Sequence, residues 1–345
     1  MERPARYCSE GSDETICCGL CPRLCTIPSG SFGSCGVRGN KNGRALIPYY
    51  GQITAMAVDP IEKKPLYHYR PGTSILSIGF AGCNLHCPFC QNWQISQSAG
   101  FDGKRLPTPA GPNDIISAAL RGDSGAIAYT YSEPLVHAEF LLDCMALAHR
   151  HGLANVLVTN GCINAEAAQD ILPLADAANI DLKCFSQDSY AEILGGDLET
   201  VLAFIKFALA KNVHVEITTL VVPDFNDSVE ELDSCVDFIA SLNAGPDAAA
   251  IPWHLSAYHP DYRWNAPPTD PGFLKRIKKR ASEKLPYVYA GNIPGEQNDT
   301  FCPHCKTLLV QRRGYRTDTP ALAPPLEGEG VYRCSQCGGK TPVVR

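Results

Sequence analysis

The stretch GCNLHCPFC, from Gly82 to Cys90, decides how the rest of the chain is interpreted. Cys83, Cys87 and Cys90 are spaced C-x3-C-x2-C, and they follow directly after the apolar run Ser74–Phe80. Thiolates suit iron–sulfur clusters and zinc. Electron-transfer clusters usually take four cysteine ligands. Three thiols on one compact loop can instead hold three irons of a [4Fe–4S] cube and leave the fourth iron open to a small molecule.

Zinc is the alternative occupant of this loop. A closed zinc site needs a fourth protein ligand, and His86 is the candidate. His86 sits inside the loop, however, where its ring would compete with the thiols for space. The loop also follows the first of a series of predicted strands, and active sites of βα barrels lie at the carboxyl ends of strands. We therefore expect an iron–sulfur cluster here.

Short apolar runs alternate with helical patterns from about residue 74 to 290. Most runs are apolar on both faces, as in a parallel sheet that helices cover. The predicted strands are Ser74–Phe80, Ala126–Tyr131, Asn155–Thr159, Asn179–Cys184, His214–Val222, Ala250–Ala257 and Tyr287–Ala290. The predicted helices are Val136–Arg150, one capped by Asp197, one opened by the capping box Ser228/Glu231, and one from Asp270-Pro271 to near Lys284. Six βα repeats and a last strand predict an α/β fold, namely a complete or partial TIM-like barrel rather than a doubly wound sheet.

Charge and hydropathy exclude several kinds of partner. The 345 residues carry a formal net charge of −6, whereas a surface that binds nucleic acid is usually basic. No run of about 18 apolar residues occurs, so no membrane span is expected. The first residues lack the apolar stretch of a signal peptide. We therefore expect a cytoplasmic protein with neither membrane nor nucleic acid as partner.

Cysteine is the compositional anomaly, with 17 residues. In a reducing compartment, clustered thiols indicate metal ligation more than disulfides. Thirteen cysteines fall within residues 8–35, 83–90 and 302–337. The other four are isolated in apolar sequence and are expected to pack in the core: Cys144, Cys162, Cys184 and Cys235.

The last cysteine group has the spacing of a zinc ribbon. Cys302-x2-Cys305 and Cys334-x2-Cys337 form two knuckles, and a repeated C-x2-C is a strong zinc signal. The alternatives are two unrelated knuckles or a rubredoxin-like iron site. A partner-docking role is open as well, because the 28 intervening residues exceed the usual spacing.

The first cysteine group has a less certain ligand set. Cys18, Cys21, Cys25 and Cys35 offer four thiols in a segment that is too short for a core of its own. A tetrahedral zinc site is the first interpretation and an auxiliary iron–sulfur cluster the second. Cys8 and Cys17 are nearby substitutes. The predicted units are a Cys-rich segment 1–50, a core domain 51–297 and a zinc-ribbon-like module 298–345.

The central loop resembles the signature of the radical S-adenosylmethionine (SAM) superfamily, with an aromatic residue, Phe89, just before the third cysteine. The resemblance implies a partial (β/α)6 barrel whose open iron binds the amino and carboxylate groups of SAM. It also implies that Glu133 accepts a hydrogen bond from the SAM amino group and that Phe89 packs near the adenine. The remaining implied contacts are Asp181 and Lys183 around SAM and His254 near its ribose.

A closer resemblance is to the radical SAM protein of the AmmeMemoRadiSam system. The segments that carry it are Cys21–Arg38, Asp59–Leu66, Cys90–Ser96, Tyr129–Pro134, Trp253-His254 and Tyr289–Asn292. It implies an association with Memo-type and AMMECR-type proteins. The sequence also resembles pyruvate formate-lyase activating enzymes.

These expectations define one main function and two rivals. The main expectation is reductive cleavage of SAM at a [4Fe–4S] cluster to a 5′-deoxyadenosyl radical, which abstracts hydrogen from an unidentified protein or small molecule. This chemistry requires a flavodoxin- or ferredoxin-like reductant. The first rival is a glycyl-radical-enzyme activase. The second is a non-catalytic zinc-binding scaffold.

Overall fold

The computed structural model describes residues 2–97, 109–243 and 250–345. Its centre is an eight-stranded sheet with the strand order β14-β13-β12-β11-β10-β9-β8-β7. Seven of these strands are parallel: β8 (Ser74–Gly79), β9 (Ala126–Thr130), β10 (Ala154–Thr159), β11 (Ala177–Asp181), β12 (His214–Val221), β13 (Trp253–Ala257) and β14 (Val288–Gly291). The predicted six βα repeats with a last strand are therefore confirmed, and the sheet has two free edges, as a partial barrel does.

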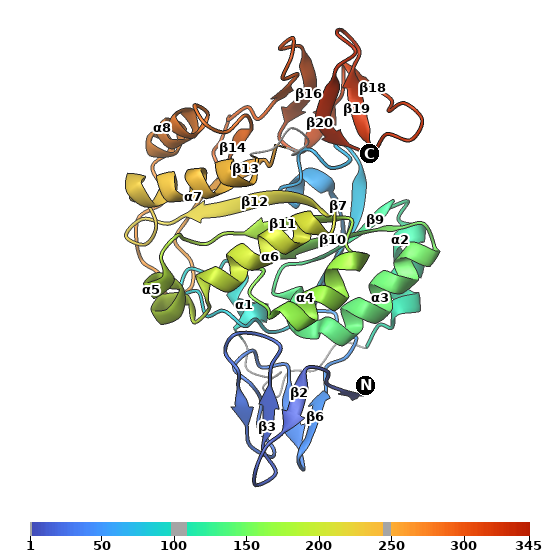
Figure 1. Cartoon of the computed structure of the whole chain (residues 1–345), viewed down its shortest axis with the longest axis vertical. Coiled ribbons are helices and arrows are strands. Elements are labelled where there is room, and N and C mark those ends of the chain that lie inside the picture. The colour runs from blue at the N-terminus through green and yellow to red at the C-terminus, as the bar shows by residue number, and fades with distance from the viewer. Residues whose placement is uncertain (1, 98–108, 244–249) are drawn as a thin grey trace.

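Helices cover the outer face of the sheet (Figure 1). The helices in the described part of the chain are α1 (Trp93–Ser96), α2 (Pro112–Arg121), α3 (Ala138–Arg150), α4 (Ala165–Ile171), α5 (Gln187–Ser189), α6 (Leu198–Ala210), α7 (Val229–Leu242) and α8 (Pro271–Ala281). Of these, α1 lies at the barrel mouth, next to the cysteine loop (Figure 1). Short 3-10 or π turns are η1 (Ile61–Lys63), η2 (Pro134–His137), η3 (Leu172–Leu174) and η4 (Tyr190–Leu194). Asp197 and Ser228 cap α6 and α7 as predicted. The four isolated cysteines are all buried in the main core, also as predicted.

The sequence pattern did not predict strand β7 (Ala55–Pro60), which pairs antiparallel with β8. Met56 and Val58 on this strand have 46% and 49% of their surface exposed. The apolar residues of β7 are therefore not all buried in the core, and their pattern does not predict a strand. After β7 the chain crosses the amino-terminal ends of the parallel strands. Ile61, Leu66 and Tyr69 pack there against small side chains of β9 to β11, and this packing closes one end of the barrel.

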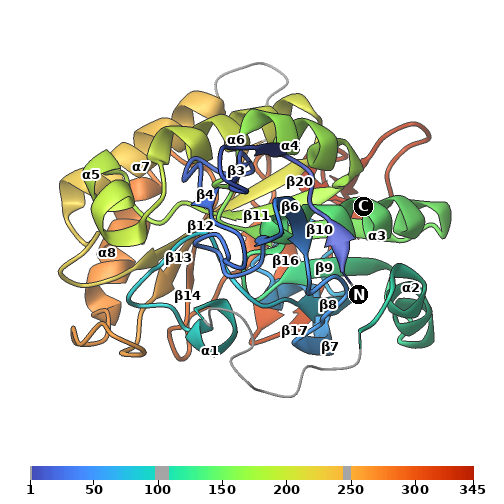
Figure 2. The same ribbon diagram turned by 90° about the horizontal axis from the view of Figure 1, so that it is seen from below.

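Two small modules lie at opposite ends of the molecule (Figure 1). The N-terminal module holds two three-stranded antiparallel sheets, formed by β1 (Arg3–Pro4), β6 (Arg44–Ile47) and β5 (Gly39–Lys41), and by β2 (Cys8–Glu10), β3 (Ile16–Cys18) and β4 (Thr26–Ile27). Seen from below, these strands lie over the centre of the barrel (Figure 2). A buried ion pair, Arg38 Nη2 to Glu139 Oε1 at 3.0 Å, fastens the module to α3.

The C-terminal module covers the closed end of the barrel. Its sheets are formed by β15 (Thr300–Phe301), β16 (Leu308–Arg313) and β17 (Arg316–Asp318), and by β18 (Leu322–Ala323), β19 (Val331–Cys334) and β20 (Lys340–Val344). The Val344 amide donates to His68 O at 2.7 Å, and the Arg70 amide donates to Val344 O at 2.9 Å. In the described part of the chain, no helix is long and apolar enough to cross a membrane.

Candidate active site

The cysteine loop leaves the carboxyl end of β8 through Gly82, where no side chain fits. Gly82 has φ +83°, and an ideal Cβ would lie 2.4 Å from Cys35 O and 2.4 Å from Val37 Cγ2. A positive φ is easily reached only by glycine. Gly82 therefore turns the chain sharply enough to present the next eight residues, Cys83 to Cys90, at the barrel mouth.

The thiols of this loop have partners that suit metal-bound sulfur. Cys83 Sγ accepts from the Leu85 amide at 3.4 Å and faces Asn160 Nδ2 at 3.7 Å, and Cys90 Sγ lies 3.1 Å from the Ser96 hydroxyl. Burial raises the pKa of Cys83 well above its ordinary value and that of Cys87 to about 12. Without a metal these thiols would therefore stay protonated at neutral pH, and cationic iron is the kind of partner that would ionise them.

The spacing of the three sulfurs argues against a single zinc ion. Two sulfurs on one zinc lie at most about 4.6 Å apart, since each Zn–S bond is about 2.3 Å. In the part of the chain that the structure describes, one group of three or more ligating side chains has all its ligand atoms within 4.8 Å, and that group is C-terminal. At least one pair among the Cys83, Cys87 and Cys90 sulfurs therefore lies more than 4.8 Å apart. A cube with one thiolate on each of three irons accommodates such a separation.

A cavity of about 310 Å³ lies in front of the loop, at the carboxyl ends of the strands. It brings together most of the site residues that the sequence predicted: Cys83, Cys87, Cys90, Phe89, Glu133, Asp181 and Lys183. The Phe89 ring also packs on Phe225, with ring centroids 4.8 Å apart.

Glu133 is fully buried at the carboxyl end of β9. Its Oε1 accepts from the Leu135 amide at 3.0 Å and the Thr159 hydroxyl at 2.7 Å, and its Oε2 accepts from the Asn160 amide at 2.8 Å. Burial outweighs these bonds and raises the pKa from 4.5 to about 7. Oε2 retains acceptor capacity, which suits it to a cationic ligand in the cavity.

Lys183 and Asp181 form a pair at the end of β11, with Nζ 2.7 Å from Oδ2. Burial opposes the charge on Lys183, but the Asp181 carboxylate raises its pKa above the ordinary value. The ammonium group therefore stays positive and faces the cysteine loop.

The structure separates His254 from the other predicted SAM contacts. His254 does not belong to the residues that line the cavity. Its Nε2 lies 2.6 Å from Glu216 Oε2, and its ring stacks on Tyr289 at 5.4 Å between centroids. Glu216 also accepts from the backbone amides of Tyr67 and His68, at 3.0 and 2.7 Å. His254 therefore lies in a buried polar cluster with Glu216 and Tyr289, beside the cavity-lining Thr218, and its expected place near the SAM ribose stays a prediction.

Residue-level reasoning missed a second charged group on the cavity wall. Asp59 Oδ2 accepts from Lys64 Nζ at 2.8 Å and from the Tyr131 hydroxyl at 2.9 Å, and its Oδ1 accepts from Lys63 Nζ at 2.9 Å. The Lys64 side chain is 2% exposed, although Lys64 lines the cavity. The sequence analysis named segment 59–66 only as part of a resemblance. The residue types alone did not predict a buried ion pair, because a Lys-Lys pair usually lies on a solvated surface.

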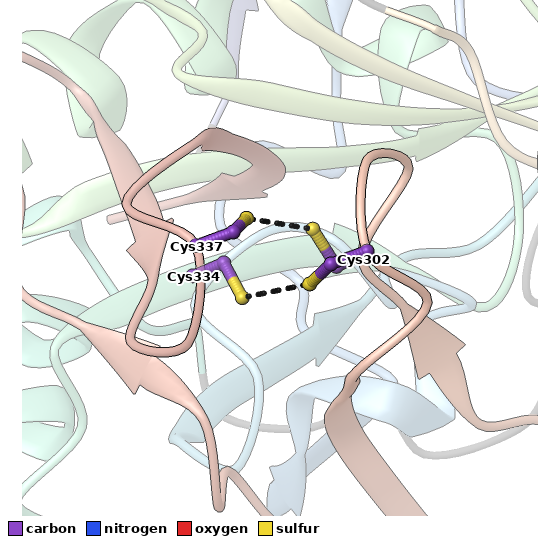
Figure 3. Close-up of side chains that lie close together, drawn as sticks. Cys302, Cys334 and Cys337 are labelled. Carbon is purple, nitrogen blue, oxygen red and sulfur yellow. Dashed lines mark hydrogen bonds between the residues drawn. The ribbon is translucent and has the colours of Figure 1, made fainter.

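The C-terminal knuckles converge as a zinc site requires. Cys302, Cys305, Cys334 and Cys337 hold their sulfurs within 4.8 Å of one another. Figure 3 shows the thiols of two loops facing each other, with Cys302 Sγ 3.7 Å from Cys337 Sγ and Cys305 Sγ 3.6 Å from Cys334 Sγ. This tetrad fits one tetrahedral ion.

The N-terminal thiols do not converge in this way. No three of them fall within the 4.8 Å limit that the C-terminal tetrad meets. Cys18 lies opposite Cys8 across the β2–β3 pair, and Cys8 Sγ is 3.8 Å from Arg38 Nη2. Cys17 points outward and is exposed.

Comparisons with known proteins agree with this arrangement. A protein of Methanocaldococcus jannaschii described as uncharacterized is 38% identical over 346 residues, 99% of each chain. The pyruvate formate-lyase 1-activating enzyme of Escherichia coli K12 is 23% identical over 193 residues, 55% of this chain and 77% of that enzyme. A radical SAM methyltransferase structure from Sphaerobacter thermophilus matches with a TM-score of 0.50 and 11% identity, over 84% of this chain and 76% of that one, and supports the fold alone.

The sequence model of the radical SAM superfamily matches residues 77–238. That range contains the cysteine loop, Glu133, Asp181 and Lys183. Four of the seven parallel strands, β9 to β12, lie wholly inside it. The chain is an enzyme with a radical SAM superfamily domain over these residues.

Proposed function

We propose that this enzyme holds a [4Fe–4S] cluster through Cys83, Cys87 and Cys90 and cleaves SAM reductively to a 5′-deoxyadenosyl radical. The radical would abstract hydrogen from a protein or small-molecule substrate at the barrel mouth. The observation that carries the proposal is the three-thiol loop, spread too widely for one zinc ion and facing a cavity with a buried acid and a buried ammonium group. The same spread argues against the zinc-scaffold rival.

The residues around the cavity suit the two ends of a zwitterionic amino acid. Glu133 would accept from the SAM amino group through its remaining capacity at Oε2. Lys183, kept charged by Asp181, would face the SAM carboxylate, and Phe89 would pack near the adenine. The cluster, when bound, supplies the electron that breaks the sulfonium C–S bond. A flavodoxin- or ferredoxin-like protein would provide that electron, and the cavity walls would exclude water.

A glycyl-radical activase is the second candidate. The match to a pyruvate formate-lyase activating enzyme, which extends over 77% of that enzyme's length, favours this candidate. The resemblance to the AmmeMemoRadiSam protein instead favours Memo-type or AMMECR-type partners. We would supply each class in turn during SAM turnover and measure which one gains a glycyl radical signal or exchanges deuterium with SAM.

The central proposal is tested by replacing Cys83, Cys87 and Cys90 with Ala. We expect no 5′-deoxyadenosine from the triple variant with dithionite and SAM, while the far-UV circular dichroism is unchanged, because the thiols lie in a loop. Cys17→Ala, on an exposed strand position, is the control and should keep full activity. Undiminished SAM cleavage by the triple variant would refute the proposal.

A further inference from the structure

Two lysines line the cavity from the turn that follows β7. Lys63 is the last residue of η1, and Lys64 comes directly after it. Strands β10, β9 and β8 lie between β7 and β11, the strand that ends just before Lys183. Asn179 Nδ2 donates to Pro65 O at 2.8 Å and so fixes this turn against the barrel interior. The two lysines therefore form a second cationic group at the cavity.

A single carboxylate holds both ammonium groups from behind. Asp59 Oδ1 accepts from Lys63 Nζ at 2.9 Å, and its Oδ2 accepts from Lys64 Nζ at 2.8 Å. Asp59 can neutralise only one of the two charges, and it does not itself line the cavity. Each ammonium group has three donors, of which Asp59 takes one. The lysines therefore present free donors and one uncompensated positive charge to the cavity.

The charge on Lys64 is costly where it lies. Its side chain is 2% exposed, and an ammonium group removed from water needs compensating partners. Burial lowers the pKa of Lys64 despite the contact with Asp59. A negatively charged group in the cavity would therefore stabilise the charged form of Lys64, whereas a neutral or cationic group would not.

Tyr131 completes this group at a conformational cost. Its φ is +72°, a value that bulky residues rarely adopt. Its ring centroid lies 4.5 Å from Lys64 Nζ, and its hydroxyl donates to Asp59 at 2.9 Å. Gly79 leaves room for the ring, because an ideal Cβ there would lie 2.8 Å from Tyr131 Cδ2. Strained backbone is typical of functional sites, and here it fixes the carboxylate that holds the two lysines.

SAM leaves this second cationic group without a partner. SAM carries one carboxylate, which the proposed function assigns to Lys183, and its amino and sulfonium groups are both cationic. We propose that Lys63 and Lys64 bind a carboxylate or phosphate group of the substrate, so that the substrate of this enzyme is an acidic molecule. The assignment of that group to the substrate rests on the proposed function, whereas anion binding by the two lysines does not.

The test measures anion binding by the reconstituted full chain, with SAM present to occupy Lys183. Inorganic phosphate and acetate are the two probes, each titrated by isothermal calorimetry at constant ionic strength. We expect saturable binding of at least one probe at one site per chain. Lys63→Met should weaken this binding roughly tenfold, as loss of a charge-assisted hydrogen bond would, and Lys63→Arg should retain it. The probe that binds more tightly indicates whether the substrate group is a phosphate or a carboxylate.

Lys41 provides the surface control, since it pairs with Glu2 and its side chain is 62% exposed. Lys41→Met should leave binding of the probe unchanged. Lys63→Met alters a side chain that is 45% exposed and is expected to fold, so the result does not depend on a change at the buried Lys64. Absence of saturable binding in the wild type, or binding that Lys63→Met leaves unchanged, would overturn the inference.

Failure of this inference and failure of the proposed function give different results. If a probe binds as expected but the reduced protein yields no 5′-deoxyadenosine from SAM, only the proposed function fails. If SAM is cleaved but neither probe binds in a manner that depends on Lys63, only this inference fails.

Discussion

Glu133 combines burial with three accepted hydrogen bonds, and this combination makes SAM affinity depend on pH. Below its pKa of about 7 the free carboxyl group is protonated, and binding an ammonium group requires that proton to leave. We therefore expect SAM affinity to rise about tenfold per pH unit below about 7 and to level off above it. For the free protein the sign is opposite: ionising the buried acid makes folding stability fall as pH rises from 4.5 to about 7.

Glu133→Gln tests this role. The amide cannot accept at both atoms, so SAM binding should weaken by about 1.5–3 kcal/mol, the scale of a charge-assisted hydrogen bond. Iron content should be unchanged, and the Glu133-dependent part of the pH slope should vanish. Titrations of SAM into reconstituted protein at several pH values measure both effects. Loss of iron would instead assign Glu133 a structural role.

Lys64 and Lys63 bind the same carboxylate, Asp59, from different environments. Their side chains are 2% and 45% exposed. Lys64→Met should cost roughly 1.5–3 kcal/mol in the free energy of unfolding, whereas Lys63→Met should cost about 0–1 kcal/mol. Urea denaturation measures the difference, and equal losses would contradict it.

Hydrogen bonds from both lysines and Tyr131, against the effect of burial, hold the pKa of Asp59 below 3.8. This stabilisation is therefore present above about pH 4 and is lost as the pH falls.

The sequence predicts those site residues whose surroundings depend only on their place at the end of a strand. Cys83, Glu133 and Lys183 follow strand ends, and the topology alone brings strand ends together. His254 shows the limit of that reasoning. Its β13 position is in register with Thr218, which lines the cavity, but its imidazole bonds to Glu216. The direction that the ring takes depends on this long-range partner, and no local pattern encodes that.

At the scale of elements, caps were the most readable signals. Asp197 accepts from the Thr200 amide at 2.8 Å at the start of α6. Asp197→Ala should lower the free energy of unfolding by about 1 kcal/mol, within the usual range of about 0.5–2. Asp188→Ala, an exposed carboxylate in α5, is the matched control and should change it little. Thermal or urea unfolding of both variants decides the matter, and equal effects would mean that the cap contributes nothing.

The sequence analysis missed the strands that lie outside the parallel, helix-covered part of the sheet. Strand β7 pairs at an edge and exposes alternate apolar side chains. The strands of both modules have two to six residues, too few for a periodic pattern to emerge. Part of the loop between the C-terminal knuckles also forms strands β17 and β18. Cysteine spacing predicted these modules, but not their sheets.

At the scale of the whole molecule, the two modules serve different ends of the barrel. The N-terminal module contacts the cysteine loop, whereas the C-terminal module covers the closed end (Figure 1). Arg312 of β16 donates to Tyr67 O and to the Thr300 hydroxyl, and its guanidinium lies 4.3 Å from the Tyr67 ring centroid. None of the residues that line the cavity comes from the C-terminal module. This placement gives the module a structural task away from the reaction.

Because the C-terminal module lies away from the cavity, loss of metal from its cysteine tetrad should affect folding but not SAM cleavage. Metal supplies much of the folding free energy of a module shorter than about 50 residues. Cys334→Ser should therefore unfold the C-terminal module, uncover Tyr67 and Tyr289, and lower the melting temperature of the whole chain. SAM cleavage per folded molecule should persist, because the cysteine loop lies at the other end. Differential scanning calorimetry, iron content and 5′-deoxyadenosine yield together make the test, with Cys305→Ser as a second tetrad variant. If either variant melts as the wild type does but has lost the core iron, the C-terminal tetrad and the core cysteine loop are coupled, and this prediction is wrong.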